Sequence, residues 1–162
     1  MVTGLNVIRS VLYHIENTPI NGQTMKQIYS GWTSRVEERD PTVEWRVETT
    51  DSFPLCVVVS AVPSSTLFYG SSLEIWDVSG VVFCLVLNQG IVDSGRSKQQ
   101  QANVAHNLIS LFTKESIAIR DWAQMVGGKP QIIKWGRVEL TSLAFVPNTF
   151  NLSWTVRVSF PL

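Results

Sequence analysis

Apolar residues recur in this chain with two different periods, one typical of helices and one typical of strands. In the first segment they recur at the helical spacing, at Leu5, Ile8, Val11, Leu12 and Ile15. Polar residues occupy most of the positions between them. This pattern predicts an amphipathic helix over residues 4–17, ended by Asn17-Thr18-Pro19.

A second helix is predicted over residues 98–112. Ser97 stands three residues before Gln100, which is the spacing of a capping box at a helix N-terminus. The apolar side carries Val104, Leu108, Leu111 and Phe112. The remaining surface bears amides in place of charges, at Gln99, Gln100, Gln101, Asn103 and Asn107. We interpret this amide surface either as a solvated face or as a surface that contacts a partner.

Much of the remaining chain is typical of strands. In residues 42–48 apolar and charged positions alternate, which predicts a half-exposed strand. The apolar run 55–62 follows Phe53-Pro54 and predicts a strand buried on both faces. Residues 73–88 predict a further strand, with a bulge at Ser79-Gly80. Residues 20–41 are ambiguous between a short helix and an ordered loop.

The C-terminal third predicts two strands that form an antiparallel hairpin. Gly127-Gly128-Lys129-Pro130 predicts a turn, and residues 132–145 follow as one long strand or two short ones. After a turn at Pro147-Asn148, every even position from Phe150 to Leu162 is apolar. This alternation predicts a strand with one dry face. Two arrangements stay open for it, pairing within its own sheet or pairing at a boundary between subunits.

The order of these elements is helix, strands, helix, strands, without an internal repeat or a low-complexity linker. We therefore predict one α+β domain over residues 1–162, with a mostly antiparallel sheet flanked by the N-terminal helix and the second helix. A chain of this length can bury a core large enough to fold without a disulfide or a metal.

Composition favours self-association. Thirteen basic and thirteen acidic residues give a net charge of zero, and only 16% of residues are charged, against roughly 25% in an average domain. Such a surface has no general attraction to nucleic acid or anionic membrane, and little repulsion keeps copies apart. Six tryptophans are more than a small core hides easily, and tryptophan is enriched where proteins meet.

The sequence carries no recognisable catalytic or metal-binding motif. Neither His14 nor His106 has a Cys, His or carboxylate at the helical spacing of a ligand pair. No Gly-x-Ser-x-Gly nucleophile elbow is present, and Gly127-Gly128-Lys129 lacks the spacing of a phosphate loop. Aromatic residues interleave with cations at Trp45-Arg46 and at residues 134–137. Surfaces that bind nucleic acid combine the same residue types, but we favour ordinary cross-strand packing as the interpretation. We expect no enzymatic activity, no catalytic residue, no cofactor and no metal.

Cysteines and termini add little. Cys56 and Cys84 each lie in an apolar run, which predicts buried thiols and leaves a disulfide between them open. Residues 1–4 show no basic start or apolar block of an export signal. The longest apolar run, 81–87, is too short to span a bilayer.

The element order resembles the tail-terminator, or tail-completion, proteins of long-tailed bacteriophages. The resemblance is carried by a helix ending near Pro19, the strand Phe53-Pro54-Leu55-Cys56-Val57-Val58-Val59, a capped helix of about four turns and a closing pair of long strands. It covers most of the chain and depends on element order and size, without a sharp motif. Residues 20–41 are longer and richer in Trp and Tyr than the family pattern requires.

The resemblance implies a subunit that forms a ring, usually of six copies, at the head-proximal end of the tail tube. Such a ring ends tail growth and joins the tail to the head-side connector. Its partners would be the tail tube protein, the connector protein and possibly the sheath protein, with no membrane and no sequence-specific nucleic acid. The expected location is the neck of the virion, after assembly in the host cytoplasm.

Other readings stay open, namely another head-tail joining or baseplate subunit, or a small non-viral binding module. The candidate contact residues come from a predicted loop tip and from the second helix, at Leu67, Phe68, Tyr69, Gln100, Asn103 and Asn107.

Overall fold

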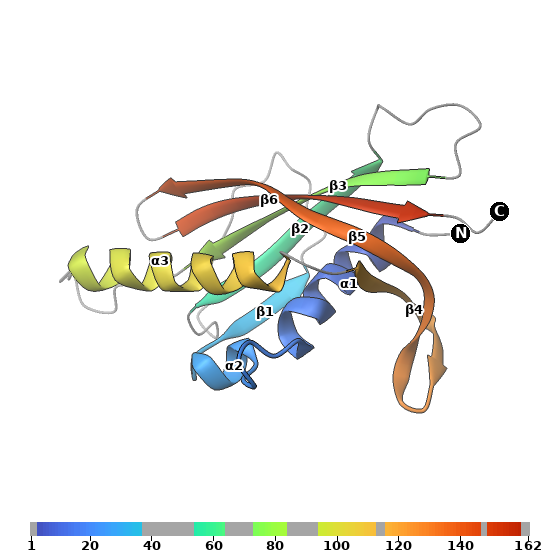
Figure 1. The fold of residues 1–162 in the computed structure, drawn as a ribbon, viewed down its shortest axis with the longest axis horizontal. Helices are drawn as coiled ribbons and strands as arrows, with labels where there is room; N and C mark the ends of the chain where they lie inside the picture. Colours follow the sequence, from blue (N-terminus) through green and yellow to red (C-terminus); the bar gives the residue numbers. More distant parts are fainter. Residues whose placement is uncertain are drawn as a thin grey trace.

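The computed structural model describes residues 3–36, 54–63, 73–83, 94–112, 116–146 and 149–159. Its main feature is one curled six-stranded sheet with the strand order β1-β2-β3-β6-β5-β4 (Figure 1). The strands are β1 (Thr33–Val36), β2 (Leu55–Pro63), β3 (Leu73–Phe83), β4 (Ser116–Val126), β5 (Lys129–Val146) and β6 (Thr149–Ser159). The helices are α1 (Gly4–Asn17), α2 (Met25–Ile28) and α3 (Ser94–Leu111).

The predicted α+β fold class is wrong, although its mostly antiparallel sheet is partly right. The described part of the chain is mostly sheet, with 53% strand against 32% helix. The sheet is mixed, because β1 runs parallel to β2 with Thr33 beside Leu55, while the pairs β2–β3, β3–β6, β6–β5 and β5–β4 are antiparallel. The sequence did not reveal β1, since all four of its residues are half-buried and show no alternation. The single domain over residues 1–162 stays a prediction.

Helix α1 lies in the hollow of the curled sheet. Its predicted bounds, 4–17, are confirmed, and the Thr3 hydroxyl caps the helix by accepting a hydrogen bond from the Asn6 amide at 3.2 Å. Helix α1 contacts β1 and β2 as well as β4, although β1 and β4 are the two opposite edges of the sheet. The sheet therefore curves around α1 until both of its edges reach the same helix (Figure 1).

One main core joins the concave face of the sheet to α1 and α3. Its largest residues include three tryptophans, Trp32, Trp76 and Trp154, so the core hides more of these rings than composition suggested. Cys56 is buried in the same core, whereas Cys84 lies outside the described residues. A second buried cluster, Leu55, Val57 and Val81, occupies the alternate positions of β2 and β3 and so faces the other side of the sheet. The predicted burial of β2 on both faces is confirmed for residues 55–58.

Strand β6 is central in the sheet of its own subunit. It pairs with β3 on one side and β5 on the other, so Trp154 lies between Val78 and Leu140. The predicted antiparallel hairpin of β5 and β6 is confirmed. Trp154 and Val156 are buried while Arg157 is exposed and pairs with Glu139 at 3.3 Å, as the alternation predicts. Among described residues, β6 pairs along both edges inside the subunit.

Several local predictions differ from the structure. Helix α3 begins at Ser94, so Ser97 and Gln100 lie inside it and the predicted capping box is wrong. A glycine within the first turn, Gly95, costs a helix only about 1 kcal/mol, which the rest of the helix offsets. The bulge predicted at Ser79-Gly80 lies in the partner strand, where the register shifts between Val58 and Ser60. The strand predicted at 42–48 lies outside the described residues.

The ambiguous segment 20–41 is settled as far as residue 36. Its helix α2 begins after Thr24, whose backbone amide donates to the Gln27 side chain at 2.8 Å. Met25 anchors α2 by burying its side chain completely in the main core. The chain then forms β1, so this segment supplies both a short helix and an edge strand.

The Ser10 hydroxyl makes two hydrogen bonds, and one of them joins α1 to the edge strand β4. Its buried hydroxyl donates to the Asn6 carbonyl at 2.6 Å and accepts from the Arg120 backbone amide at 2.9 Å. We expect Ser10→Ala to lower the free energy of unfolding by about 1–3 kcal/mol, because the Arg120 N–H loses its acceptor. Urea unfolding measures this. The control Asn17→Ala removes an exposed hydrogen bond and should cost at most about 0.5 kcal/mol; equal losses in the two variants would contradict the assigned role.

Gly80 leaves the space that the Trp154 ring fills. A Cβ atom at Gly80 would lie 2.9 Å from the Val57 carbonyl oxygen and 3.0 Å from Trp154 Cζ3. We expect Gly80→Ala to destabilise the fold by about 1–3 kcal/mol, since backbone and ring cannot both move away. Thermal and urea unfolding measure the loss. Ser79→Ala, on the opposite face of the same strand, should cost clearly less, and a neutral Gly80→Ala would show that the sheet accommodates the methyl group.

Candidate functional site

The hairpin of β4 and β5 is the feature of the described chain that most suggests a binding surface. Its turn is Gly127-Gly128, with φ angles of +60° and +78°. Two consecutive positive φ values match the tight two-residue turns that connect twisted strands, and glycine adopts them without strain. The predicted turn is confirmed, and β5 is one long strand, an alternative that the sequence left open.

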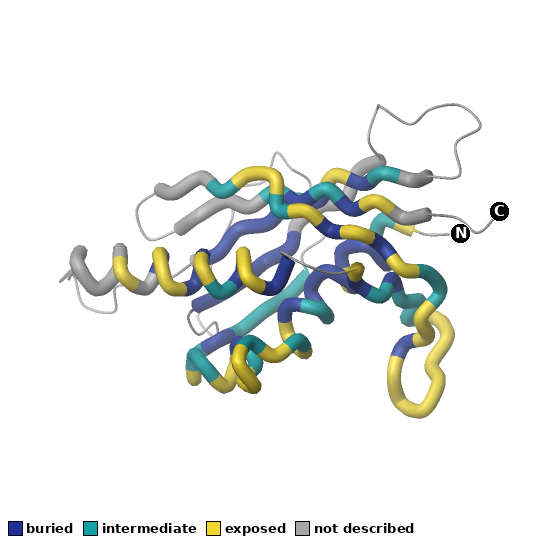
Figure 2. Tube along the Cα trace, in the orientation of Figure 1, coloured by how far each residue is buried: buried dark blue, intermediate teal, exposed yellow. Residues whose placement is uncertain are grey.

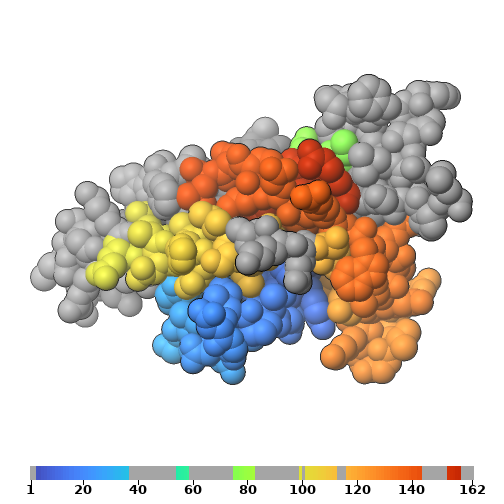
Figure 3. Space-filling view, viewed as in Figure 1, coloured from blue at the N-terminus to red at the C-terminus, as the bar shows by residue number. Residues whose placement is uncertain are grey.

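The hairpin starts in the core and ends in solvent. At its base, Ile117 and Ile119 are buried under α1. Every residue from 123 to 129 is exposed, whichever way its side chain points (Figure 2). The tip projects from the body of the molecule, at the lower right of Figures 1 and 3. An isolated pair of strands has little stability of its own in water, so the base must hold the tip in place.

The hairpin exposes apolar side chains at its tip, in Met125 and Val126, and nearer its base, where Ile132 pairs with Arg120 and Trp135 with Ala118. Five large apolar side chains are exposed in the part of the chain that the structure describes, and four of them belong to β4 and β5. These four, the apolar hairpin residues, are Met125, Val126, Ile132 and Trp135, with exposed fractions of 56%, 63%, 41% and 59%. The fifth is Ile109 on α3. Apolar residues clustered on one protruding element mark an interaction site more strongly than scattered ones.

Arg120 fixes the base of the hairpin to the body. Its Nη1 donates to the Pro130 carbonyl at 3.0 Å, which ties β4 to β5 beside a break in their register. The guanidinium carbon lies 4.5 Å from the centre of the Tyr13 ring, at cation–π distance. Trp122 packs its ring against the same tyrosine in an edge-to-face contact at 6.1 Å. The hairpin is therefore held rigidly to α1 at its base and stands free at its tip.

A shallow cavity of about 380 Å³ lies between α1 and the base of this hairpin, and His14 lines it together with Arg120 and Trp135. His14 Nε2 lies 2.8 Å from the Leu111 carbonyl oxygen, which can only accept, so Nε2 carries a proton. Nδ1 lies 2.9 Å from the Thr18 hydroxyl, which donates to it when the ring is neutral. Nε2 thus joins α1 to the end of α3, and Nδ1 joins the helix to Thr18, the residue that follows it, so both nitrogens have structural partners.

Other kinds of site are not found in the described part of the chain. There, no group of three or more His, Cys, Asp and Glu residues is placed to hold a metal ion. Of the helices described, none has the length and apolar character needed to cross a membrane.

None of the predicted contact residues that the structure describes belongs to the hairpin. Leu67, Phe68 and Tyr69 fall outside the described residues. Gln100 lies in α3, although its side chain is not described, and Asn103 is exposed on the same helix. These positions stay predictions as contact residues.

Asn107 is half-buried and donates to the Tyr29 hydroxyl at 2.8 Å, so its amide holds α3 to the segment after α2. The sequence missed the hairpin surface because residues 116–126 show no clean period. A strand exposed on both faces has no reason to alternate. One signal in the sequence could have indicated this surface. Apolar residues flank the Gly-Gly turn on both sides, and they follow neither the helical nor the strand period.

We expect Arg120→Met to loosen the hairpin without unfolding the sheet. The variant keeps most of the side-chain stem but loses the hydrogen bond to Pro130 and the charge over Tyr13. Losing a partly buried hydrogen bond of about 1 kcal/mol should speed amide hydrogen exchange in residues 121–132 about fivefold. Exchange in β3 and β6 should not change. Arg137→Met, at an exposed position, is the matched control. Equal exchange rates in the two variants would show that Arg120 does not anchor the hairpin.

In comparisons with known proteins, the chain matches no family model and no curated protein.

Proposed function

We propose that this chain is a structural subunit that assembles with copies of itself into a ring, and that the ring is a tail terminator of a long-tailed bacteriophage. The proposal that copies of the chain assemble rests on one observation, the projecting hairpin. It exposes four apolar residues, Met125, Val126, Ile132 and Trp135. Water contact of these side chains is unfavourable, and covering them stabilises a complex by roughly 25 cal/mol per Å² of apolar surface.

A second copy of the chain is the occupant that fits this hairpin best. The hairpin extends from the β4 edge of the sheet, while β1 forms the opposite edge. A contact between two different patches is head-to-tail, and such contacts close into rings when the rotation per subunit allows it. A net charge of zero leaves little repulsion against this packing.

The place of the ring in a virion follows from the resemblance of the element order, in which an N-terminal helix precedes the strands and a pair of long strands closes the chain. In this role the ring would sit at the head-proximal end of the tail tube, stop its growth and present a surface to the connector. The tail tube protein and the connector protein would be its partners, and the sheath protein is a further candidate. It would have no enzymatic activity.

The first test is the solution mass of the purified protein by light scattering at several concentrations and salt levels. We expect a closed species near six subunits that tolerates salt, because apolar contacts are not screened. Met125→Lys should weaken association at least about a hundredfold, since a charge buried without a partner costs several kcal/mol.

Gln124→Lys is the matched control, because it places the same charge beside Met125 at an exposed polar position. It should leave the mass of the wild-type assembly unchanged. A Met125→Lys variant that assembles as well as wild type would exclude the hairpin as the contact. Binding of the ring to the tail tube protein separates a terminator from a baseplate or other head-tail joining subunit, and a protein that stays monomeric even with tail tubes would contradict the ring and favour a binding module.

A further inference from the structure

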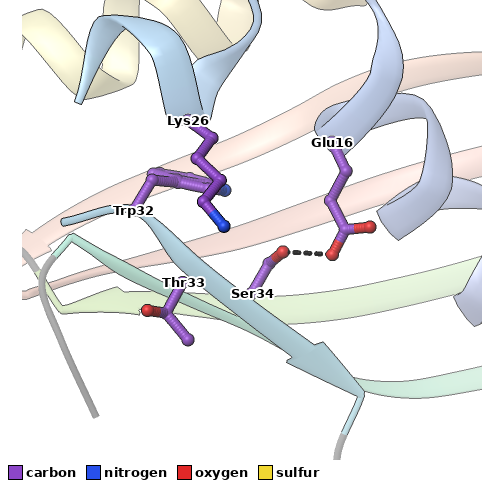
Figure 4. Close-up of a pocket in the computed structure, with 5 residues that line it drawn as sticks. All are labelled: Glu16, Lys26, Trp32, Thr33 and Ser34. Atoms are coloured by element: carbon purple, nitrogen blue, oxygen red, sulfur yellow. Dashed lines mark hydrogen bonds between the residues drawn. The ribbon is translucent and has the colours of Figure 1, made fainter. Parts of the chain in front are cut away.

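A second cavity lies where the end of α1 meets α2 and β1. Its volume is about 350 Å³, within the range of pockets that take small molecules. Glu16 comes from α1, Lys26 from α2, Trp32 from the residue before β1, and Thr33 and Ser34 from the start of β1 (Figure 4). A cation, a carboxylate, an indole and the Ser34 hydroxyl thus line one small space, while the Thr33 hydroxyl donates to the Gly31 carbonyl.

Two walls of this cavity carry opposite charges. Figure 4 shows Lys26 and Trp32 on one side, with Glu16 and Ser34 facing them on the other. The Ser34 hydroxyl donates a hydrogen bond to Glu16 Oε1 and thereby orients the carboxylate. The Lys26 ammonium and the Glu16 carboxylate form no ion pair with each other within 4.0 Å, although both are exposed and line the same cavity.

Trp32 adds a polar group without a partner. Its side chain is about nineteen-twentieths buried, with 5% of its surface exposed, and its indole Nε1 has no hydrogen-bond acceptor. Buried indole N–H groups normally find one. The indoles of Trp76 and Trp154 also lack acceptors, and all three tryptophans belong to the main core. Of the three, Trp32 lines this cavity, and Figure 4 draws its nitrogen on the side of the ring toward Lys26.

We propose that this cavity binds a small free zwitterion of the amino-acid type. The carboxylate of the ligand would accept hydrogen bonds from Lys26 Nζ and Trp32 Nε1. Its ammonium group would donate to Glu16, which has acceptor capacity beyond the bond from Ser34. Hydrogen bonds that involve charged groups are the stronger ones, so both ends of the ligand contribute.

The two walls together favour a zwitterion over a simple ion. An anion placed beside Lys26 would be repelled by Glu16, and a cation placed beside Glu16 would be repelled by Lys26. A ligand with both charges satisfies both walls at once. The Lys26 side chain is exposed, so it can shift to admit the ligand at little cost, because exposed rotamers interconvert within nanoseconds.

The residues of this site differ from those of the proposed assembly surface. The cavity lies at the β1 edge of the sheet, and the apolar hairpin residues lie at the β4 edge. Loss of one property does not require loss of the other, so the two proposals can fail separately.

The test follows the indole N–H signals of the full-length protein by two-dimensional NMR. The Trp32 signal is assigned by its disappearance in Trp32→Phe. The protein is titrated separately with alanine, leucine, acetate and methylammonium. We expect alanine or leucine to shift the Trp32 proton downfield to saturation while the other indoles stay in place. Acetate and methylammonium should bind at least about tenfold more weakly, since each loses one set of charged hydrogen bonds.

Variants of the two exposed charged residues decide the assignment without disturbing the core. Lys26→Met and Glu16→Gln should each weaken binding of alanine or leucine about tenfold. Lys129→Met and Glu139→Gln remove the same charges elsewhere on the surface and should leave it unchanged. The proposal is overturned by an unmoved Trp32 signal, by acetate that binds as tightly as the amino acids, or by full affinity in both cavity variants.

Discussion

The fold depends on one constraint, the burial of α1 inside a sheet whose two edges both turn toward it. Val7, Val11 and Ile15 have no exposed surface, and they face strands from both halves of the sheet. An open sheet edge is a liability in water because its backbone groups lack partners. Here the edge β4 receives a substitute partner from Ser10 on the helix. The curl, the main core and the anchoring of the hairpin all follow from this single helix.

Strand β6 gives the sheet its continuity. Among the described strands, β6 alone lies between β3 and β5 and pairs with both. The two halves of the sheet are therefore joined by the pairing of β3 with β6, which are far apart in the sequence. Trp154 marks this junction: its ring packs beside Gly80 on one strand and against Phe112 at the end of α3, 5.8 Å away. Long-range pairing of this kind carries a large loop-closure entropy and forms slowly. We therefore place the junction among the late steps of folding.

The sequence was sufficient where one face of an element is dry and the other is wet. The apolar residues of helix α1 and of the buried part of β6 recur with a regular period, so the sequence predicts both elements. Such a period arises when one face of an element contacts the core and the other contacts water. Strand β1 is half-buried on both faces, and the tip of the hairpin is exposed on both, so neither shows a period. The pairing partner of a strand is set by tertiary contacts, and this is why the parallel β1–β2 pair could not be predicted. The cavity beside Trp32 joins residues from three elements, two of which lay in the ambiguous segment.

The length of α1 has a further consequence. Tyr13, which holds the base of the hairpin, and Glu16, which lines the cavity at the other sheet edge, lie three residues apart on one helix. A helix of this kind moves as a unit, so a rotation of α1 that alters one position alters the other. Glu16 also lines a small cavity together with Tyr13 and Trp122, so the two sites are neighbours along one helix. Whatever effect a ligand beside Glu16 has on contacts made by the hairpin, those contacts must have an equal effect on the affinity for the ligand, because thermodynamic coupling is reciprocal.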